Sequence, residues 1–516
     1  MKTLNTLYHL ALADFLERTR RYSFLIMLGL IIFLGYAAAS GQMIMRIYPD
    51  YTGELNSAWV GTLMALTVSF FLGLFGFFLI KGSIARDYIS GVGQIMATTQ
   101  MTRPIYMLGK WMSNFAVLSV MILILLCSGV LMNLFAGTPI DLWAMIAPMI
   151  FIAFPCMAFI SGFAVLFESI HWLRGSFGNF VYFLLFPFFV IPIIELKTYI
   201  PLLDVLGFRL IGDAIARAAQ LVYPDSTGGF TFTITVLDNP KIFPFSGIIW
   251  SSEVVIWRIV ILFLGLAIPI MASIFFDRFN PSKLLPSKKR GDRTQAQDVS
   301  TSKPTNDPDI HLTPIPVTRH GFRIDTIYLA EIKLLLKGQH WWWYGITTGL
   351  IIAQFANTTE VTRILLVISW LWLLPLLSNL GSRENRYNTQ QIVFSAPHSA
   401  LTQLSAAWIS AFTLLAMVGS GALFKFMLLG EIHSIFGWIA GVVFIPSLAL
   451  TFGVLTGSNK PFEIIYILWM YLVLQRVPLL DFVGITPDSP WIAYLTLSPI
   501  LAFLSYIVRN RKSKNC

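Results

Sequence analysis

Side chains that could act as nucleophiles, proton donors or metal ligands are few in this 516-residue chain and lie far apart in the sequence. Cys127 and Cys156 lie within apolar segments and Cys516 is the last residue, so the cysteines indicate neither a disulfide framework nor a metal cluster. Isolated histidines near the ends of apolar segments are more often interfacial residues than bases or ligands; these are His171, His340, His398 and His433.

No short motif supplies catalytic chemistry either. The chain has no GxxxxGK[ST] segment, whose backbone amides and lysine hold nucleotide phosphates, so any role driven by ATP needs a separate subunit. It also has no HExxH pair for zinc and no GxSxG turn for a nucleophilic serine. We therefore predict no catalytic residue, no metal site and no enzyme activity for this chain alone.

Ionisable side chains are absent from the central parts of the apolar segments, where they would mark a path for ions or protons because their burial is costly. Glu168 lies near one end of its segment, and Arg258 and Lys425 lie near the opposite ends of theirs, where a long side chain can reach the headgroups. This pattern disfavours a carrier that couples transport to protons or sodium through buried carboxylates.

Composition places these residues in a membrane. The chain is 56% hydrophobic and 12% charged, with a mean hydropathy of +0.72, which is typical of a polytopic membrane protein. The first apolar segment is expected to remain as a span rather than to be cleaved as a signal peptide. Because about twenty apolar residues cross the hydrocarbon core, we predict twelve spans, near residues 24–40, 58–80, 108–135, 143–167, 177–195, 254–276, 343–357, 364–381, 404–429, 436–456, 463–475 and 491–508.

Basic residues are concentrated in alternate loops. Arg18, Arg103 and Lys337 fall on the same side as the basic C-terminal tail, and the positive-inside rule makes that side cytoplasmic. Both termini are therefore expected in the cytoplasm, with the protein in a cell membrane that we expect to be the bacterial cytoplasmic membrane. Orientation, rather than a nucleic-acid partner, explains the net charge of +10.

The segment 86–111 is the most regular polar stretch between two spans. It begins with one apolar helical face, which predicts a short helix lying on the membrane surface; the face is formed by Ile84, Tyr88, Val92, Ile95 and Met96. Pro104 disfavours helix at Arg103, so we expect a turn there before the next span begins.

A similar segment, 383–408, recurs 297 residues later. Each copy follows one apolar segment and precedes a longer one, so we predict that the chain contains two related halves. The matched pairs include Arg86 with Arg383, Asp87 with Glu384, Gln94 with Gln391, Ile95 with Ile392, Thr98 with Ser395, and Trp111 with Trp408.

The first copy resembles the cytoplasmic coupling loop between the second and third spans of permeases from ABC exporters of the drug- and polysaccharide-export type. In that family an acid ends the second span and is followed by a glycine-containing helix, a Thr-x-x-x-(Thr/Ser)-Arg turn and a Gly-Lys pair. The matching residues are Asp87, Gly91, Thr98, Thr102, Arg103, Gly109 and Lys110. The second copy departs from the pattern, with Pro397-His398-Ser399 at the turn and no Gly-Lys pair.

The resemblance implies that cytoplasmic ABC ATPase subunits, two copies in number, dock against the surface helices. ATP and Mg are expected in those subunits, and this chain holds no cofactor of its own. The polar side chains of the first surface helix are expected to face outward, toward the partner. The coupling residues implied are Arg86, Asp87, Gln94, Arg103, Arg383, Glu384 and Gln391.

An amphipathic helix precedes the first span of each half, around residues 12–16 and 329–333. Such a helix lies flat in the headgroup region with its charges in water. The resemblance implies that these leading helices flank the ATPase contact; a plain surface helix without a partner is the alternative. The charged residues concerned are Asp14, Glu17, Glu331 and Lys333.

Residues 277–325 are rich in proline, serine, threonine and charge, which predicts a cytoplasmic linker between a first permease half, 1–276, and a second, 326–516. The long outer segment 196–253 is expected to contain a helix near 205–221, with Arg209, Asp213 and Arg217 on one face, and then a small hairpin.

These observations predict an all-α polytopic membrane protein with about twelve transmembrane helices in two pseudo-repeated six-helix halves. Its expected function is that of a permease subunit of an ATP-driven ABC exporter, moving an amphipathic or lipid-like cargo such as a lipid, glycan, peptide or drug. Membrane lipid is an expected partner, and accessory or substrate proteins are left open. The alternatives are a membrane-embedded enzyme or assembly factor acting on lipid-linked substrates, and a secondary carrier.

Overall fold

The computed structural model describes residues 2–514 except 21, 40–42, 49, 136–139, 191–199, 227, 235–239, 278, 280–323, 388, 396–398, 475 and 487–488. The described chain is mostly helical, which confirms the prediction of a helical membrane protein at that level. Eight helical segments are long and apolar enough to cross a membrane: Ser57–Tyr88, Arg103–Leu131, Leu142–Ser169, Ser252–Phe275, Thr359–Leu377, Ala400–Val418, Ile432–Thr456 and Trp491–Lys512.

The first part of the chain, up to residue 279, contains two helices before the first long span and a pair of short helices after it. Its helices are α1 (Lys2–Thr19), α2 (Tyr22–Ala39), α3 (Ser57–Phe71) continued by η1 (Leu72–Gly76) and α4 (Phe77–Ile80), α5 (Ser83–Ile89), α6 (Val92–Thr98), α7 (Arg103–Phe135), α8 (Leu142–Pro148), η2 (Met149–Ala153), α9 (Phe154–Ser169), η3 (His171–Leu173), α10 (Ser176–Leu185), η4 (Phe186–Phe189), α12 (Phe208–Val222) and α13 (Ser252–Phe275).

The second part follows the predicted linker, most of which lies outside the described residues. Its helices are α14 (Ile324–Leu336), α15 (Trp341–Ala356), α16 (Thr359–Trp372), α17 (Leu374–Leu377), α18 (Arg383–Arg386), α19 (Gln390–Phe394), α20 (Ser399–Val418), α21 (Ser420–Leu429), α22 (Ile432–Thr456), α23 (Lys460–Leu474), η6 (Pro478–Leu480) and α24 (Trp491–Lys514). Each predicted apolar segment overlaps at least one of these helices, but within the described residues only eight of the twelve correspond to a helical segment long enough to cross a membrane.

The predicted span near 404–429 is divided into α20 and α21 at Gly419. The indole Nε1 of Trp438 donates to the Gly419 carbonyl at 2.9 Å, so this oxygen has a partner outside its own helix. A Cβ atom at position 419 would lie 2.7 Å from the indole nitrogen of Trp438 and 2.9 Å from that of Trp370. Glycine therefore allows two tryptophans to approach the backbone at the break.

A small sheet joins two segments of the first part, 43–53 and 230–243. Its strands are β1 (Met43–Ile47), β2 (Tyr51–Gly53), β3 (Phe230–Ile234) and β4 (Lys241–Phe243), in the order β3-β1-β2-β4. The predicted hairpin within 196–253 is wrong for the described strands, because β3 pairs antiparallel with β1 and β4 pairs parallel with β2. The partner strands come from a loop that the sequence did not identify as extended.

A buried ion pair anchors the helix next to this sheet. Asp204 accepts the backbone N–H groups of Arg209 and Leu210 at the start of α12, and its carboxylate lies 3.1 Å from the guanidinium of Arg258 on α13. Asp204 is fully buried and Arg258 is 2% exposed. The expectation that Arg258 reaches the headgroups is therefore wrong, because a carboxylate distant in sequence neutralises it inside the protein.

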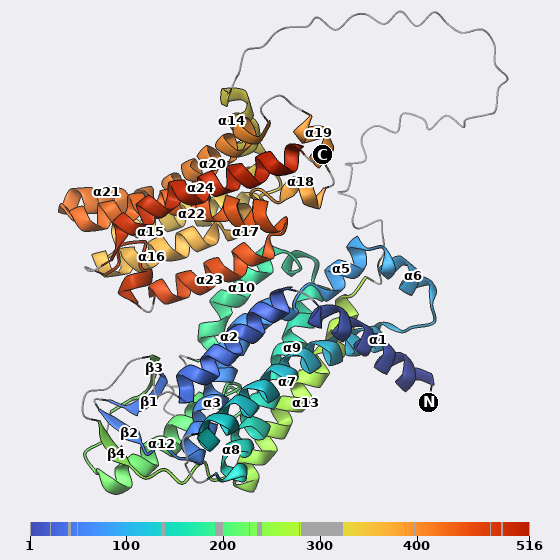
Figure 1. Ribbon diagram of the computed structural model, residues 1–516, viewed down its shortest axis with the longest axis vertical. Coiled ribbons are helices and arrows are strands. Elements are labelled where there is room, and N and C mark those ends of the chain that lie inside the picture. The colour runs from blue at the N-terminus through green and yellow to red at the C-terminus, as the bar shows by residue number, and fades with distance from the viewer. Residues whose placement is uncertain are drawn as a thin grey trace, which may run out of the picture.

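Figure 1 shows the helices in two groups, one from each part of the chain, with α10 and α23 where they meet. In each group the last long helix packs along an earlier one, α13 on α9 and α24 on α22. The short helices α5, α6, α18 and α19 lie at the same end of the two groups (Figure 1), which we call the surface-helix end. The sheet and α12 lie at the opposite end, the sheet end.

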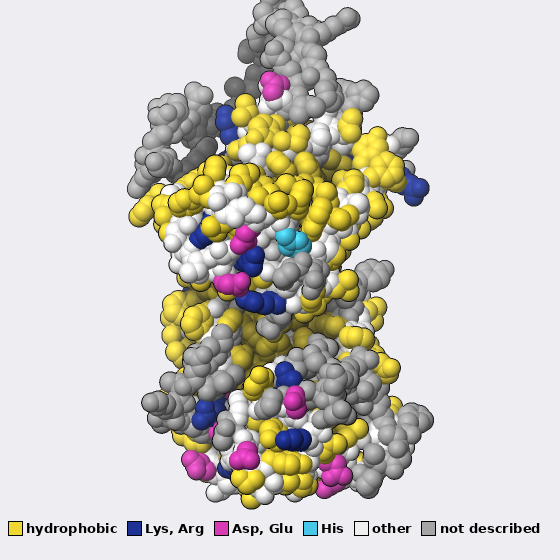
Figure 2. Space-filling view, turned by 90° about the vertical axis from the view of Figure 1, so that its left-hand side faces the viewer, with side chains coloured by type: hydrophobic (Ala, Val, Ile, Leu, Met, Phe, Trp, Pro, Cys, Tyr) yellow, Lys and Arg dark blue, Asp and Glu magenta, His cyan; other side chains and the backbone are white. Residues whose placement is uncertain are grey.

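The sheet end carries charges of both signs over both groups (Figure 2). In the second part, Arg363 lies 2.8 Å from Glu431 and 3.2 Å from Glu360, and Arg476 lies 2.6 Å from the same Glu360. Glu360 and Arg476 are each more than half exposed, so their contact is an ordinary surface pair worth at most about 1 kcal/mol.

Candidate functional site

The predicted surface helix of segment 86–111 is two short helices, α5 and α6, rather than one. Gly91 between them has a φ of +74°, in the left-handed region that glycine adopts without strain. The apolar face predicted from helical spacing is therefore interrupted, and Val92 and Ile95 are exposed, Ile95 by 69%.

Glu168 on α9 fixes the start of α5. Its fully buried carboxylate accepts hydrogen bonds from the backbone N–H groups of Gly82, Ser83 and Ile84. These donors have no partner within a helix that starts at this point. A carboxylate at the end of the long apolar helix α9 therefore holds the first turn of the short helix α5.

Lys110 joins three helices at the surface-helix end. Its ammonium group is completely buried and lies 2.7 Å from a carboxylate oxygen of Asp14 on α1 and 2.7 Å from one of Asp87 on α5. The hydroxyl of Tyr106, one turn earlier on α7, donates to Asp87 at 2.6 Å. A buried ammonium group needs such partners, so α1, α5 and α7 are held together by one cluster, the Lys110 cluster.

The structure corrects the expected orientation of the acids in this half. Asp87 and Asp14 are 6% and 8% exposed, so neither faces outward or lies in water. Arg86 pairs with Glu17 of the leading helix at 2.7 Å, and this pair is partly exposed. Two further predicted coupling residues, Gln94 and Arg103, are exposed and lie outside the Lys110 cluster.

The second part has a related cluster around Glu384 and Glu331, which are each 8% exposed. Arg509 on α24 lies 2.9 Å from Glu384, and Arg383 lies 2.9 Å from Glu331 on the leading helix α14. Gln403 on α20 donates to Glu384. The expected positions of these two glutamates at the surface are therefore also wrong, whereas Gln391 and Lys333 are exposed.

One contact occurs in both parts at equal sequence separation. Tyr106 donates to Asp87, and Gln403 donates to Glu384, and donor and acceptor are 19 positions apart in each pair. The four residues match in the 297-residue alignment. The position of Lys110, however, is taken by Ala407, and arginines from α18 and α24 supply the positive charge instead.

Burial sets the proton affinity of the leading-helix glutamate. It raises the pKa of Glu331 above the ordinary value of 4.5, and the guanidinium of Arg383 offsets part of this shift. The neighbouring negative charge of Glu384 acts in the same direction as burial.

The two parts meet through a polar junction near the surface-helix end. Lys460 donates to the backbone carbonyl of Lys81 at 2.7 Å, and the Lys81 ammonium donates to Asn179 at 2.7 Å. Glu463 on α23 accepts from Ser176 and Asn179 of α10. Charged and amide groups from both parts therefore satisfy one another at this contact.

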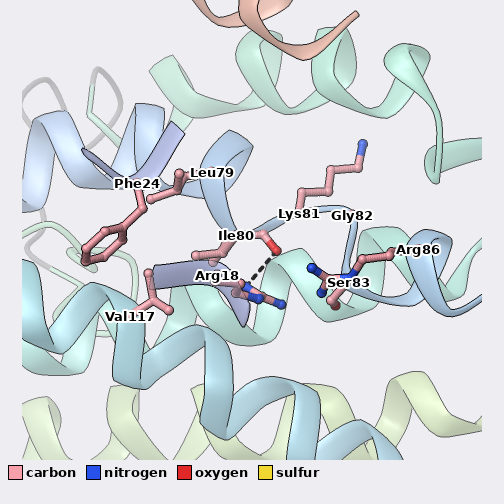
Figure 3. Close-up of a pocket in the computed structure, with 9 residues that line it drawn as sticks. All are labelled: Arg18, Phe24, Leu79, Ile80, Lys81, Gly82, Ser83, Arg86 and Val117. Carbon is pink, nitrogen blue, oxygen red and sulfur yellow. Dashed lines mark hydrogen bonds between the residues drawn. The ribbon is translucent and has the colours of Figure 1, made fainter. Parts of the chain in front are cut away.

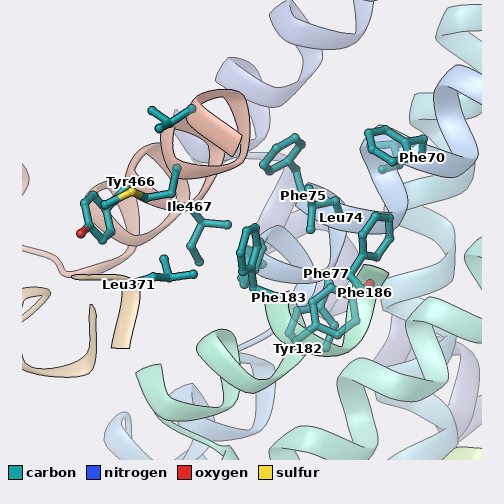
Figure 4. Packing of buried hydrophobic residues seen from close by; sticks show 14 of the residues in the cluster. Phe70, Leu74, Phe75, Phe77, Tyr182, Phe183, Phe186, Leu371, Tyr466 and Ile467 are labelled. Carbon is teal, nitrogen blue, oxygen red and sulfur yellow. The ribbon is translucent and has the colours of Figure 1, made fainter. Parts of the chain in front are cut away.

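Next to the polar junction the contact becomes aromatic and aliphatic. Figure 4 shows Ile467 of α23 next to Phe183 of α10, with Phe75 of η1 and Leu371 of α16 nearby and the Tyr466 ring on the far side of α23. All five side chains are at most 5% exposed. The two parts thus share one continuous hydrophobic core.

A basic pocket lies between α1, α4, α5 and α7 (Figure 3). Arg18 reaches across it to donate to the Ile80 carbonyl at 3.1 Å, and Arg86 and Ser83 also line it. Its volume of about 10 Å³ has room for roughly one water molecule. The pocket as it stands does not admit an organic ligand.

Within the described ranges, no group of three histidine, cysteine or acidic side chains is placed to hold a metal ion. His433 contacts the Ser489 hydroxyl at 2.8 Å and the Thr486 carbonyl at 3.0 Å, which ties the first turn of α22 to the loop before α24. The arrangement at the surface-helix end can transmit force between helices, since charged groups join them.

Sequence reasoning missed the roles of Glu168, Gln403 and Arg509, which lie far in sequence from the groups they contact. Lys110 was part of the Gly-Lys pair, but its partners were not predicted. The signal that could have indicated a buried ion pair was the charge of Lys110 at the start of a long apolar segment.

Comparisons with protein-family models, with curated proteins and with solved structures returned no match.

Proposed function

We propose that this chain is the permease subunit of an ATP-driven ABC exporter, with twelve spans in two six-span halves, 1–276 and 326–516, that form one translocation unit. Cytoplasmic ATPase subunits, two copies with their own ATP and Mg sites, would dock at the surface-helix end. The cargo would be amphipathic or lipid-like and would move outward, with the path lying between the halves.

The observation that carries this proposal is the matched attachment of a surface helix to the long helix that follows it. Asp87 is bonded to Tyr106 of α7, and Glu384 is bonded to Gln403 of α20. A push on α5 or α18 would therefore reach a membrane-crossing helix through charged, buried contacts. Such rigid coupling suits a permease that is driven by another subunit.

The docking surface follows from exposure rather than from the buried acids. Ile95 on α6 and Ile392 on α19 match in the 297-residue alignment and are 69% and 76% exposed. An exposed isoleucine on a polar surface helix is suited to fill an apolar pocket on a partner. Gln94 and Gln391 precede them and are exposed as well.

The test is copurification of the ATPase encoded beside this gene with full-length permease, together with ATP hydrolysis by the reconstituted complex. We expect Ile95→Asp with Ile392→Asp to abolish both, because a carboxylate cannot enter an apolar pocket without a desolvation penalty. Leu221→Asp is the matched control, since Leu221 is 87% exposed at the sheet end. If the double variant inserts normally into the membrane and still copurifies with the ATPase subunit, docking at this surface is refuted.

Orientation is tested separately. In the proposed topology both termini and residues 277–325 are cytoplasmic and 196–253 are outside. A cysteine at Asp225, an exposed position after α12, should react with an impermeant reagent in intact cells, and one at Ser287 should not. The opposite labelling pattern would show that the orientation in the membrane is the reverse of the one proposed.

A further inference from the structure

A cavity of about 320 Å³ lies in the second part, among α14, α18, α20 and α22. Glu331, Glu384 and Gln403 line it together with Leu334, Leu404 and Ala407. Arg383 lines it as well, so the cavity combines two carboxylates and one guanidinium group with an apolar wall, and it is of the size found for small-molecule sites.

The cavity lies at the position in the second part that corresponds to the Lys110 side chain in the first part. In the 297-residue alignment, Gln403 and Ala407 take the positions of Tyr106 and Lys110. The leading helices match at a different separation, 317 residues, which places Glu331 opposite Asp14. The Lys110 ammonium lies 2.7 Å from both acids of its cluster. Ala407 has no such group, so the corresponding space is open.

The cavity wall has acceptor capacity and apolar area for an added cation. Arg383 contacts only Oε2 of Glu331, which leaves Oε1 available for another donor among the described contacts. Arg509 does not line the cavity, but it contacts both carboxylate oxygens of Glu384 from α24, and Gln403 donates to Oε1, so Oε1 of Glu331 is the main acceptor left for an added donor. Burial raises the pKa of Glu331 even with Arg383 present, so a second cation would favour its charged form.

We infer that this cavity binds a primary alkylamine, whose ammonium group lies between Glu331 and Glu384 as that of Lys110 lies between Asp14 and Asp87. The leucine side chains would contact its methylene groups. Occupied in this way, the site joins α14 and α18 to α20, as Lys110 joins α1 and α5 to α7. The inference concerns ligand binding and does not depend on transport activity.

The test is a titration of n-butylamine at neutral pH into full-length protein in lipid nanodiscs, with the melting temperature as the readout. We expect a saturable rise, because a ligand that binds only the folded state stabilises it. n-Butanol has the same chain without the charge and should give no saturable rise. Ala407→Lys should weaken the effect of the amine by placing its own ammonium group beside the two glutamates, and Ala407→Leu by occupying the part of the cavity next to them.

Glu331→Gln should raise the half-saturating amine concentration by at least about tenfold, because it removes a charged hydrogen-bond acceptor. No saturable rise for the wild-type protein would overturn the inference. A rise that persists unchanged in both Ala407 variants would also overturn it, since the amine would then bind elsewhere. Melting of each variant without ligand shows that the protein tested is folded.

Discussion

Full burial of the Lys110 ammonium group requires anionic partners, and Asp14 and Asp87 each lie 2.7 Å away. The two acids belong to different helices, so a single side chain determines how α1 and α5 sit against α7. In the second part, Arg383 and Arg509 share this task. In both parts, cations pair with the acids of the leading helix and of the first surface helix, but the cations differ.

Lys110→Met should lower stability strongly, because it leaves two buried carboxylates without their cation; breaking a buried pair typically costs about 3–5 kcal/mol. We expect a large fall in melting temperature, measured in detergent. The triple variant Lys110→Met, Asp14→Asn and Asp87→Asn should recover much of it. Arg86→Met serves as the control, since its partner Glu17 is half exposed and the pair is worth at most about 1 kcal/mol. Wild-type melting of Lys110→Met would contradict the role of the cluster.

The raised pKa of Glu331 predicts a pH dependence of stability. Above pH 4.5 the unfolded chain releases this proton before the folded chain does, so the folded state binds more protons and the contribution of Glu331 to stability falls as pH rises. The melting temperature of wild type minus that of Glu331→Gln should therefore decrease from pH 4.5 toward the raised pKa. A difference that increases over this range would show that Arg383 outweighs burial.

At the scale of elements, the surface helices are short pieces with defined ends. Glu168 holds the start of α5, and Gly91 turns the chain from α5 into α6. This geometry exposes Ile95 while Asp87 stays buried. A single continuous helix would not separate these two side chains in the same way.

Gly91→Ala tests the turn without a steric clash, because an added Cβ at this position would meet no atom within 4 Å. The left-handed backbone should cost alanine about 1–2 kcal/mol. Gly91→Asn should cost less, because asparagine tolerates this conformation better. We expect hydrogen exchange in residues 83–98 to be faster in the alanine variant than in the asparagine variant. Equal exchange in both variants and wild type would show that the turn is not under this constraint.

For the whole molecule, the polar junction decides how the two halves are held. Glu463 on α23 accepts hydrogen bonds from Ser176 and Asn179 of α10. The hydroxyls of Ser378 and Ser176 are 3.2 Å apart. Hydrophobic contacts continue from there between α10 and α23. A path between the halves would have to open through this contact.

Cysteines at Ser176 and Ser378, in a chain whose natural cysteines are replaced by alanine, should form a disulfide on mild oxidation. A protease site placed within 280–323 provides the readout, since cleaved halves should stay together until the disulfide is reduced. Ser378→Cys with Asp225→Cys is the control pair, with one residue at the junction and the other following α12 at the sheet end. Under the proposed function, the crosslink should block export and reduction should restore it. If the cleaved halves separate under oxidising conditions, positions 176 and 378 are not in contact and the described junction is wrong.

The sequence by itself determined the helical membrane class, the positions of the apolar helices and the placement of a polar surface segment after Ile80, because these depend on local composition and on helical periodicity. The match of Asp87 with Glu384 was also visible as an internal repeat. The tertiary structure decided where those side chains point. Asp87 turned inward because Lys110 and Tyr106 on another helix satisfy it, and no local pattern encodes that choice.

The same holds for the sheet and for Arg258. β1 and β3 pair although a long stretch of chain separates them, and each strand is only five residues long, so neither has a strong pattern of its own. Arg258 is neutralised by Asp204, which the sequence placed in an outer loop. Contacts between distant segments arise from packing of the whole chain, and only the tertiary structure contains that information.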